Sequence, residues 1–212
     1  MCGRYGLLAE KKELELWAKG GDEIKAVRRF NIAPTTEVPI LVDGQELKQS
    51  RWWLVPSWSK DGKFSFSTFN ARSETLETAA SFRNLVFRQR CLVPFSFFYE
   101  WKTENKVKTP YRISPKEGGL QMFARLWDHW HKDGNSLHTF TVITREARED
   151  ITWLHNRMPI ILDPGQYQDW LNPSTDKAIV REIINHEPDV TLEFNEDDPR
   201  LNKAGWEPEN SL

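Results

Sequence analysis

The sequence is poor in cysteine, with only Cys2 and Cys91 among its 212 residues. Two cysteines do not make the disulfide framework of a small secreted protein, and the chain fits a reducing compartment. Cysteine and histidine do not cluster at zinc-ligand spacing, so we expect no metal and no other cofactor.

Long apolar runs are also lacking. Charged residues from Glu10 to Glu13 interrupt the N-terminal stretch before it reaches signal-peptide length, and no segment approaches a membrane span. We therefore expect a cytoplasmic protein with no membrane partner. The net charge of -2 and the pI near 6.2 argue against a generally basic nucleic-acid-binding protein but leave a local basic groove possible.

Turn signals and periodicity predict an α+β protein. We expect strands at 38–42, 47–54, 90–94, 97–102, 110–114, 120–127, 137–143, 159–162 and 190–194. We expect helices at 7–19, 72–80, 144–155 with Thr144 as N-cap, from Asp163-Pro164 onward, and 175–185. Many antiparallel strands with peripheral helices predict one domain over 1–212.

The N-terminus carries the most informative residue. A small residue after Met1 normally allows an aminopeptidase to remove the methionine, which would give Cys2 a free α-amine beside its thiol. These groups titrate near about 8 and about 8.5, so both have reactive fractions at neutral pH. Such a pair traps aldehydes, because the amine forms an imine and the thiol closes a thiazolidine ring. The alternative is an ordinary buried cysteine, and a retained Met1 would block the amine.

Two polar segments suggest binding or proton transfer. Asn70 and Arg72, at a strand-to-helix junction, suit substrate orientation and anion binding, or else form a capping asparagine and a surface ion pair. Strand alternation places Glu100 on one face with Phe98 and Lys102. Flanking aromatics would raise the pKa of Glu100 and let it shuttle protons, unless it points to water.

A histidine and several aromatic residues complete the candidate features. His155 lies two residues from Arg157, which suits an acid–base group beside a phosphate anchor or a histidine at a helix C-terminus. Ten tryptophans are unusual, and Trp52, Trp53 and Trp58 alternate with cations. Aromatic faces and cations suit unstacked nucleic-acid bases. Trp52 or Trp53 is expected in the core, and Trp58 is the better candidate for exposure.

Seven segments in order give a specific resemblance. They are MCGR at 1–4, FNIAP at 30–34, RWWLVPSW at 51–58, FNARSET at 69–75, RCLVPFSFFYEW at 90–101, LW at 126–127 and LHNRMPIIL at 154–162. Together they resemble the SRAP family of abasic-site processing proteins, from Met1 to about Leu171. Residues 172–212 match weakly, and their acidic residues Glu193, Glu196, Asp197 and Asp198 depart from the family pattern.

The resemblance implies a fold and a reaction. It implies a β-barrel-like antiparallel core with peripheral helices and a positively charged cleft. It also implies covalent capture of abasic sites in single-stranded DNA through a thiazolidine linkage, a DNA–protein cross-link of the SOS response and DNA repair. AP lyase and peptidase (hydrolase) activities are further implications. We expect a monomer that associates with the nucleoid when it binds DNA.

The resemblance also assigns roles to residues. It implies a catalytic set of Cys2, Asn70, Glu100 and His155. It implies DNA contacts by Arg4, Pro34, Trp58, Phe66, Arg72 and Arg157. The chain departs from the family at Phe97 and Arg125, which replace glycines, and at Asn156, which replaces an aspartate. Since phenylalanine lacks glycine's conformational freedom, the turn before residue 97 is expected to differ.

Two other functions remain open from the sequence. An N-terminal-nucleophile hydrolase, such as a glutamine amidotransferase, also begins Met-Cys-Gly, and there the Cys2 thiol would attack an amide. That reaction leaves Asn70, Glu100 and His155 without roles. A non-covalent single-stranded DNA binder would use the aromatic residues alone.

Overall fold

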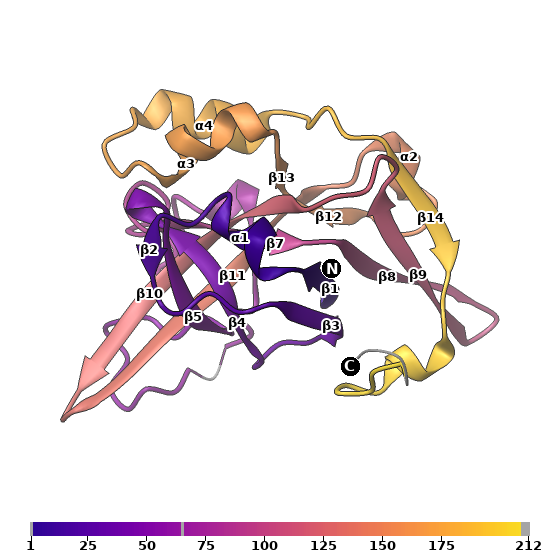
Figure 1. The fold of residues 1–212 in the computed structure, drawn as a ribbon, viewed down its shortest axis with the longest axis horizontal. Helices are drawn as coiled ribbons and strands as arrows, with labels where there is room; N and C mark the ends of the chain where they lie inside the picture. Colours follow the sequence, from indigo (N-terminus) through magenta and orange to yellow (C-terminus); the bar gives the residue numbers. More distant parts are fainter. Residues whose placement is uncertain (1, 65, 209–212) are drawn as a thin grey trace.

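The computed structural model describes residues 2–64 and 66–208, and strands make up most of it (Figure 1). One five-stranded sheet has the order β14-β9-β8-β1-β3. Its strands are β1 (Arg4–Ala9), β3 (Val27–Ile32), β8 (Phe97–Glu104), β9 (Val107–Pro115) and β14 (Leu192–Glu196). Strand β1 therefore lies inside this sheet, next to the buried Cys2.

The second sheet closes into a barrel. Its main strands are β2 (Gly20–Gly21), β4 (Glu37–Val42), β5 (Glu46–Trp52), β7 (Arg90–Phe95), β10 (Gln121–Lys132), β11 (Asn135–Glu146) and β12 (Arg157–Pro159). Two short strands join it, β6 (Asn70–Arg72) beside β11 and β13 (Ile161–Leu162) beside β10. Because β11 also pairs with β5, the strands β5, β4, β7, β10 and β11 form a closed ring.

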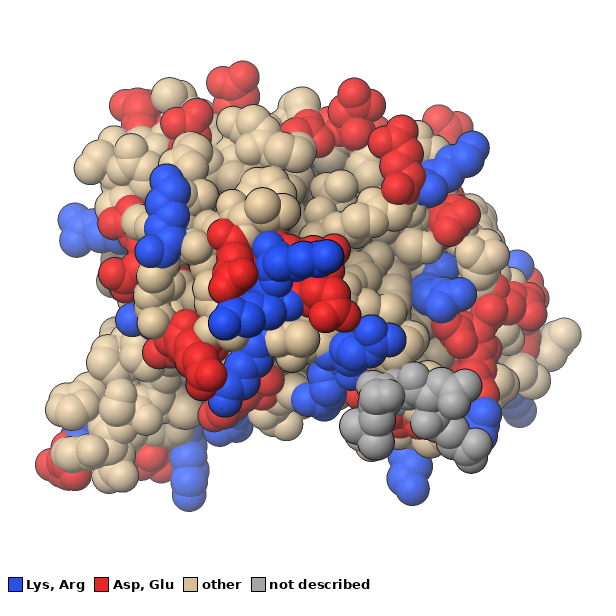
Figure 2. Space-filling view, in the orientation of Figure 1, with Lys and Arg blue, Asp and Glu red and all other residues tan. Residues whose placement is uncertain are grey.

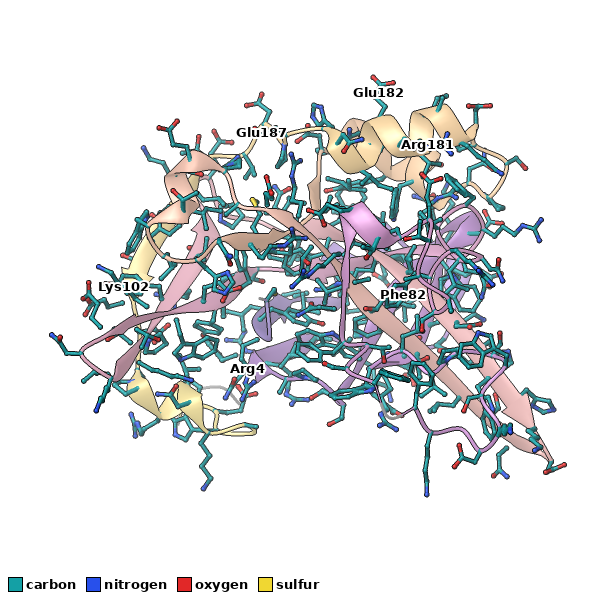
Figure 3. All side chains as sticks on the ribbon, turned by 180° about the vertical axis from the view of Figure 1, so that it is seen from behind. Arg4, Phe82, Lys102, Arg181, Glu182 and Glu187 are labelled. Carbon is teal, nitrogen blue, oxygen red and sulfur yellow. The ribbon has the colours of Figure 1, made fainter. Side chains whose placement is uncertain are left out.

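The helices are short and peripheral. They are α1 (Lys11–Glu15), α2 (Glu149–Thr152), α3 (Tyr167–Leu171) and α4 (Lys177–Asn185), with 3-10 turns at Asp43–Gln45, Ser73–Thr75, Pro164–Gln166 and Pro199–Asn202. Helices α3 and α4 lie side by side above the sheets (Figure 1). On α4, Arg181 forms an ion pair of 2.7 Å with Glu77 (Figure 3). In the described part of the chain, no helix is long and apolar enough to cross a membrane.

The expected fold class is confirmed as α+β with a barrel-like strand core and peripheral helices. The expected hairpins form, with β4 and β5 antiparallel about Asp43-Gly44 and β10 and β11 antiparallel about Asp133-Gly134. Gly44 has a φ of 69°, the left-handed conformation that glycine accepts most readily. Three pairs depart from the expected antiparallel pattern. Strands β5 and β11 close the barrel in parallel with Arg51 opposite Thr139, and the short strands β6 and β2 run parallel to β11 and β5.

Three expected helices are wrong in extent. Residues 7–9 belong to β1, and only Lys11–Glu15 is helical within 7–19. The 72–80 region forms a 3-10 turn at Ser73–Thr75 followed by further turns. Thr144 is not an N-cap, since β11 continues to Glu146 and Arg148 precedes the short α2. At residues 7–9 and 144–146, strand pairing with distant segments overrides local periodicity.

The barrel interior is aromatic and shares one buried cluster with Cys2 and Tyr5. Trp52, Phe123 and Phe140 are fully buried there, and Cys2 and Tyr5 belong to the same core cluster. The Trp52 and Phe140 rings stack with centroids 6.3 Å apart, and Trp52 Nε1 donates to the Phe69 carbonyl at 2.8 Å. This bond ties the barrel wall to the strand that carries Asn70.

Candidate functional site

Cys2 lies in the core just before β1. Its side chain is fully buried, and Sγ lies 3.9 Å from the carbonyl oxygen of Arg4. Burial raises the pKa of the Cys2 thiol to about 12, because the thiolate loses its hydration. The thiol is therefore neutral at physiological pH.

Asn70 holds the backbone of Cys2. Asn70 begins β6, which runs parallel to β11 with Asn70 opposite Val142. Its Nδ2 donates to the Cys2 carbonyl at 3.0 Å, and its buried Oδ1 has no hydrogen-bond partner among the described residues. Asn70 thus fixes the position of residue 2 and retains one acceptor beside it.

Glu100 is a buried acid on the neighbouring strand β8. Only 3% of the residue is exposed, and Phe98 on the same strand face is fully buried. Burial raises the pKa of Glu100 to about 7, as its aromatic surroundings led us to expect. Its negative charge raises the pKa of the Cys2 thiol, so the two groups interact electrostatically. A carboxyl group near pKa 7 can both accept and donate a proton at neutral pH.

His155 lies beyond α2 and is half-buried. The backbone N–H of Arg157 donates to His155 Nδ1 at 2.9 Å, which leaves the proton of the neutral imidazole on Nε2. Burial lowers the pKa of His155, so the ring is mostly neutral at physiological pH. Trp153 and not His155 is the helix C-cap.

One surface pocket of about 620 Å³ brings Arg72 and Arg157 together with His155. It is lined by Arg72, Glu146, Ala147, Thr152, His155, Asn156 and Arg157. Arg72 is exposed, whereas Arg157 donates to both carboxylate oxygens of Glu74 at 2.6 and 3.0 Å. A phosphate at this pocket would meet Arg72 directly and would compete with Glu74 for Arg157. Because β6 carries both Asn70 and Arg72, it connects this pocket to Cys2.

Other predicted contact residues lie on separate elements. Arg4 is half-buried at the start of β1, and its Nη1 donates to the Gly3 carbonyl at 3.1 Å (Figure 3). Pro34 lies in the turn between β3 and β4.

Trp58 and Phe66 are 56% and 70% exposed. The centroid of the Phe64 ring lies 5.4 Å from the centroids of the Trp58 and Phe66 rings. Trp52 is buried while Trp58 is exposed, as expected from the sequence.

Comparison with known proteins identifies the family. The model of the SRAP family, described as SOS response associated peptidase, matches residues 1–204. The chain belongs to the SRAP family. YoqW of Bacillus subtilis, named an abasic site processing protein, is 36% identical over 196 residues that cover 87% of this chain and 86% of YoqW.

Two further relatives extend this comparison. YMR114C of Saccharomyces cerevisiae carries the same description and is 39% identical over 160 residues, which cover 73% of this chain and 43% of that protein. The crystal structure of a protein from Bacteroides thetaiotaomicron superimposes with a TM-score of 0.85 at 25% identity and covers 95% of each chain. The family match includes most of the C-terminal stretch that the sequence motifs matched weakly.

Phe97 and Arg125, the two positions at which the resemblance implies glycines, have different structural settings. Phe97 pairs with Gly6, and a Cβ on Gly6 would lie 2.0 Å from the Phe97 ring. The bulky residue is thus accommodated because its partner has no side chain. Arg125 is fully buried inside the barrel. Its proximity to the site was not expected, although a charged residue within the apolar segment 122–126 was a visible signal.

The visible face of this SRAP protein carries both signs of charge. Figure 2 shows Lys and Arg intermingled with Asp and Glu, without a large area of one sign. Among residues 2–64 and 66–208, no group of three or more His, Cys, Asp or Glu side chains is arranged to hold a metal ion.

Proposed function

We propose that this SRAP protein captures abasic sites in single-stranded DNA as a covalent cross-link to Cys2. The observation that carries the proposal is the convergence on residue 2 of an amide hydrogen bond from Asn70 and the charge of a buried acid, Glu100. The curated relatives, which are named abasic site processing proteins, indicate the substrate.

The first step requires a free amine on Cys2. Met1, whose removal would create that amine, lies outside the described residues. The amine attacks C1′ of the open abasic sugar, a C–N bond forms, and loss of water gives an imine. The thiol then adds to the imine carbon. A C–S bond forms, the C=N electron pair moves to nitrogen, and the thiol proton ends on that nitrogen in the thiazolidine.

The neighbouring groups supply proton transfer and positioning. Glu100, with its pKa raised to about 7 by burial, would protonate the departing hydroxyl and accept the thiol proton. His155 would donate through Nε2–H to the sugar oxygen and assist ring opening. Asn70 would hold residue 2 so that amine and thiol meet the same carbon, which makes ring closure intramolecular.

Two further activities would share this chemistry. β-Elimination from the imine would cleave the DNA strand and give AP lyase activity. The peptidase activity in the family description would correspond to removal of Met1 or to release of the protein from the cross-link. Both are secondary to capture in this proposal.

DNA binding would use the exposed groups around the site. Arg72 would contact phosphate, and Trp58 with Phe66 would stack on bases beside the lesion. A single strand is favoured because the sugar must be reached without a paired partner. Affinity should fall with salt, since phosphate contacts release counterions.

The test is covalent capture of an abasic oligonucleotide. Wild-type protein should give a band that survives denaturation and an intact mass equal to the chain without Met1 plus DNA, less water. Cys2→Ala should abolish this product and retain non-covalent binding, because only the aminothiol is lost. Cys91→Ala is the matched control, since Cys91 is equally buried but lies within β7. Its cross-linking should persist.

The same assays separate the alternatives. Equal capture by Cys2→Ala would refute the assignment of the nucleophile. Equal affinity for intact and abasic strands without a denaturation-resistant band would identify a non-covalent binder. Glutamine hydrolysis by wild-type protein in the absence of cross-linking would identify an amidotransferase.

A further inference from the structure

Arg125 places a cation inside the barrel. It lies on β10 between Cys91 of β7 and Val142 of β11, and it is fully buried. Its guanidinium carbon lies 4.5 to 5.7 Å from the centroids of four aromatic rings, those of Phe123, Trp52, Phe140 and Tyr5. Cation–π attraction to several rings can hold a guanidinium without an ion pair.

Among residues 2–64 and 66–208, no carboxylate forms an ion pair with Arg125. Within the described part of the chain, Nε, Nη1 and Nη2 have no hydrogen-bond partner. Burial lowers the pKa of Arg125 to about 10, which leaves the group charged at neutral pH. An unpaired charge in a low-dielectric interior acts strongly on the nearest ionisable groups.

Those groups include the proposed nucleophile. Cys2 and Cys91 belong to the same buried cluster as the four rings around the guanidinium, and Arg125 interacts electrostatically with Cys2, Tyr5 and Cys91. After burial, Arg125 has the largest effect on the pKa of the Cys2 thiol and lowers it, whereas Glu100 raises it by a smaller amount. Burial keeps the Tyr5 and Cys91 groups neutral by raising their pKa values. Arg125 is therefore the principal side-chain charge that favours the Cys2 thiolate.

We propose that Arg125 is a positioning residue that stabilises the Cys2 thiolate during ring closure. The inference rests on the proposed capture reaction. In that step the Sγ proton passes to the Glu100 carboxylate, and Sγ attacks the carbon of the protonated imine. The C–S bond forms as the C=N electron pair moves to nitrogen. Arg125 remains charged throughout and offsets part of the desolvation that disfavours the thiolate.

The test measures thiolate availability without DNA. In protein whose mass shows loss of Met1, with Cys91→Ala as background, Cys2 alkylation by iodoacetamide is followed from neutral to mildly alkaline pH. Below the thiol pKa, the rate is proportional to the thiolate fraction. Arg125→Met and Arg125→Gln should slow alkylation about tenfold or more at each such pH, as expected for a pKa rise of about one unit or more. Arg125→Lys, which keeps a cation, should remain within about threefold of the background.

The variants separate charge from shape. Circular dichroism and thermal unfolding establish whether each variant is folded. An unchanged alkylation rate in a folded neutral variant would overturn the proposal. Equal slowing in all three variants, or failure of both neutral variants to fold, would also overturn it by assigning Arg125 a structural role.

A second measurement links Arg125 to the reaction. Single-turnover cross-linking should show the same order of variants, with the pH profiles of Arg125→Met and Arg125→Gln displaced to higher pH. Absence of cross-linking by the background protein would refute the capture reaction itself. The alkylation result would still report separately whether Arg125 controls Cys2 ionisation.

Discussion

The surroundings of Cys2 and the aromatic residues Trp58, Phe64 and Phe66 differ in how they constrain function. Cys2 is fully buried and Glu100 is 3% exposed, so their ionisation depends on the groups packed around them. Trp58 and Phe66 are 56% and 70% exposed, and the ring of each packs against the ring of Phe64. We expect substitutions that change charge to act on the surroundings of Cys2. Substitutions that remove ring area should instead weaken DNA binding by the exposed aromatic residues.

The largest effect is expected for Glu100→Gln, which tests whether burial holds Glu100 as an acid with a raised pKa. Burial raises the pKa of Glu100 from 4.5 to about 7, so the folded protein binds more protons than the unfolded chain between these values. The free energy of unfolding should therefore fall as pH rises from 4.5 to 7, by on the order of 3 kcal/mol from this group. Gln resembles the protonated acid in shape and should remove that decline. Urea unfolding across the pH range measures it.

Glu74→Gln is the control of opposite sign. The hydrogen bonds from Arg157 lower the pKa of Glu74, so its contribution to stability is lost as pH falls. The Glu74→Gln variant should lose stability mainly at neutral pH. If Glu100→Gln shows the same pH slope as wild type, the interior does not hold Glu100 as a high-pKa acid.

A smaller effect is expected for Trp58→Ala. Loss of one base-stacking ring should weaken binding of an abasic single strand about tenfold, within the range of aromatic–base stacking. The melting temperature should change little, because the ring is exposed. Fluorescence anisotropy measures the affinity. Trp153→Ala is a matched control, since Trp153 is 46% exposed but packs on Tyr111 and Phe194. Equal losses of affinity in both variants would show that Trp58 has no special role in DNA binding.

The smallest effect is expected for Arg72→Ala. Removing one phosphate contact should reduce affinity a few-fold and lower the salt slope by about 0.7 for a single strand. Arg88→Ala provides a control on another surface pocket. The slope is obtained from titrations at several salt concentrations. An unchanged slope for Arg72→Ala would place the phosphate contact elsewhere.

Local sequence signals predicted the hairpins and much of the site. Asp43-Gly44 and Asp133-Gly134 specify tight turns through their own backbone preferences, so both hairpins were visible without tertiary information. Alternation along β8 placed Glu100 on the same face as the buried Phe98, which accounts for its raised pKa. The family motifs identified Cys2 and Asn70 as partners, and the structure brings them into contact.

Other features depended on distant segments. Residues 7–9 have a helix-like pattern locally but form a strand, because β1 pairs with both β3 and β8. The sequence predicted that Arg157 binds phosphate, yet in the structure Arg157 forms an ion pair with Glu74 from another part of the chain. The catalytic and DNA-contact roles of the motif residues stay predictions until the substitutions above are measured.

The amino-acid sequence by itself determined the thiol at residue 2, the tight turns and the strand-rich family fold, because these depend on covalent order and local backbone preference. Tertiary structure decided the ionisation of that thiol and of Glu100. Burial removes water, and barrel closure brings the Arg125 charge from β10 toward residue 2. Electrostatic energies depend on distance and solvent exposure, which residue order does not contain.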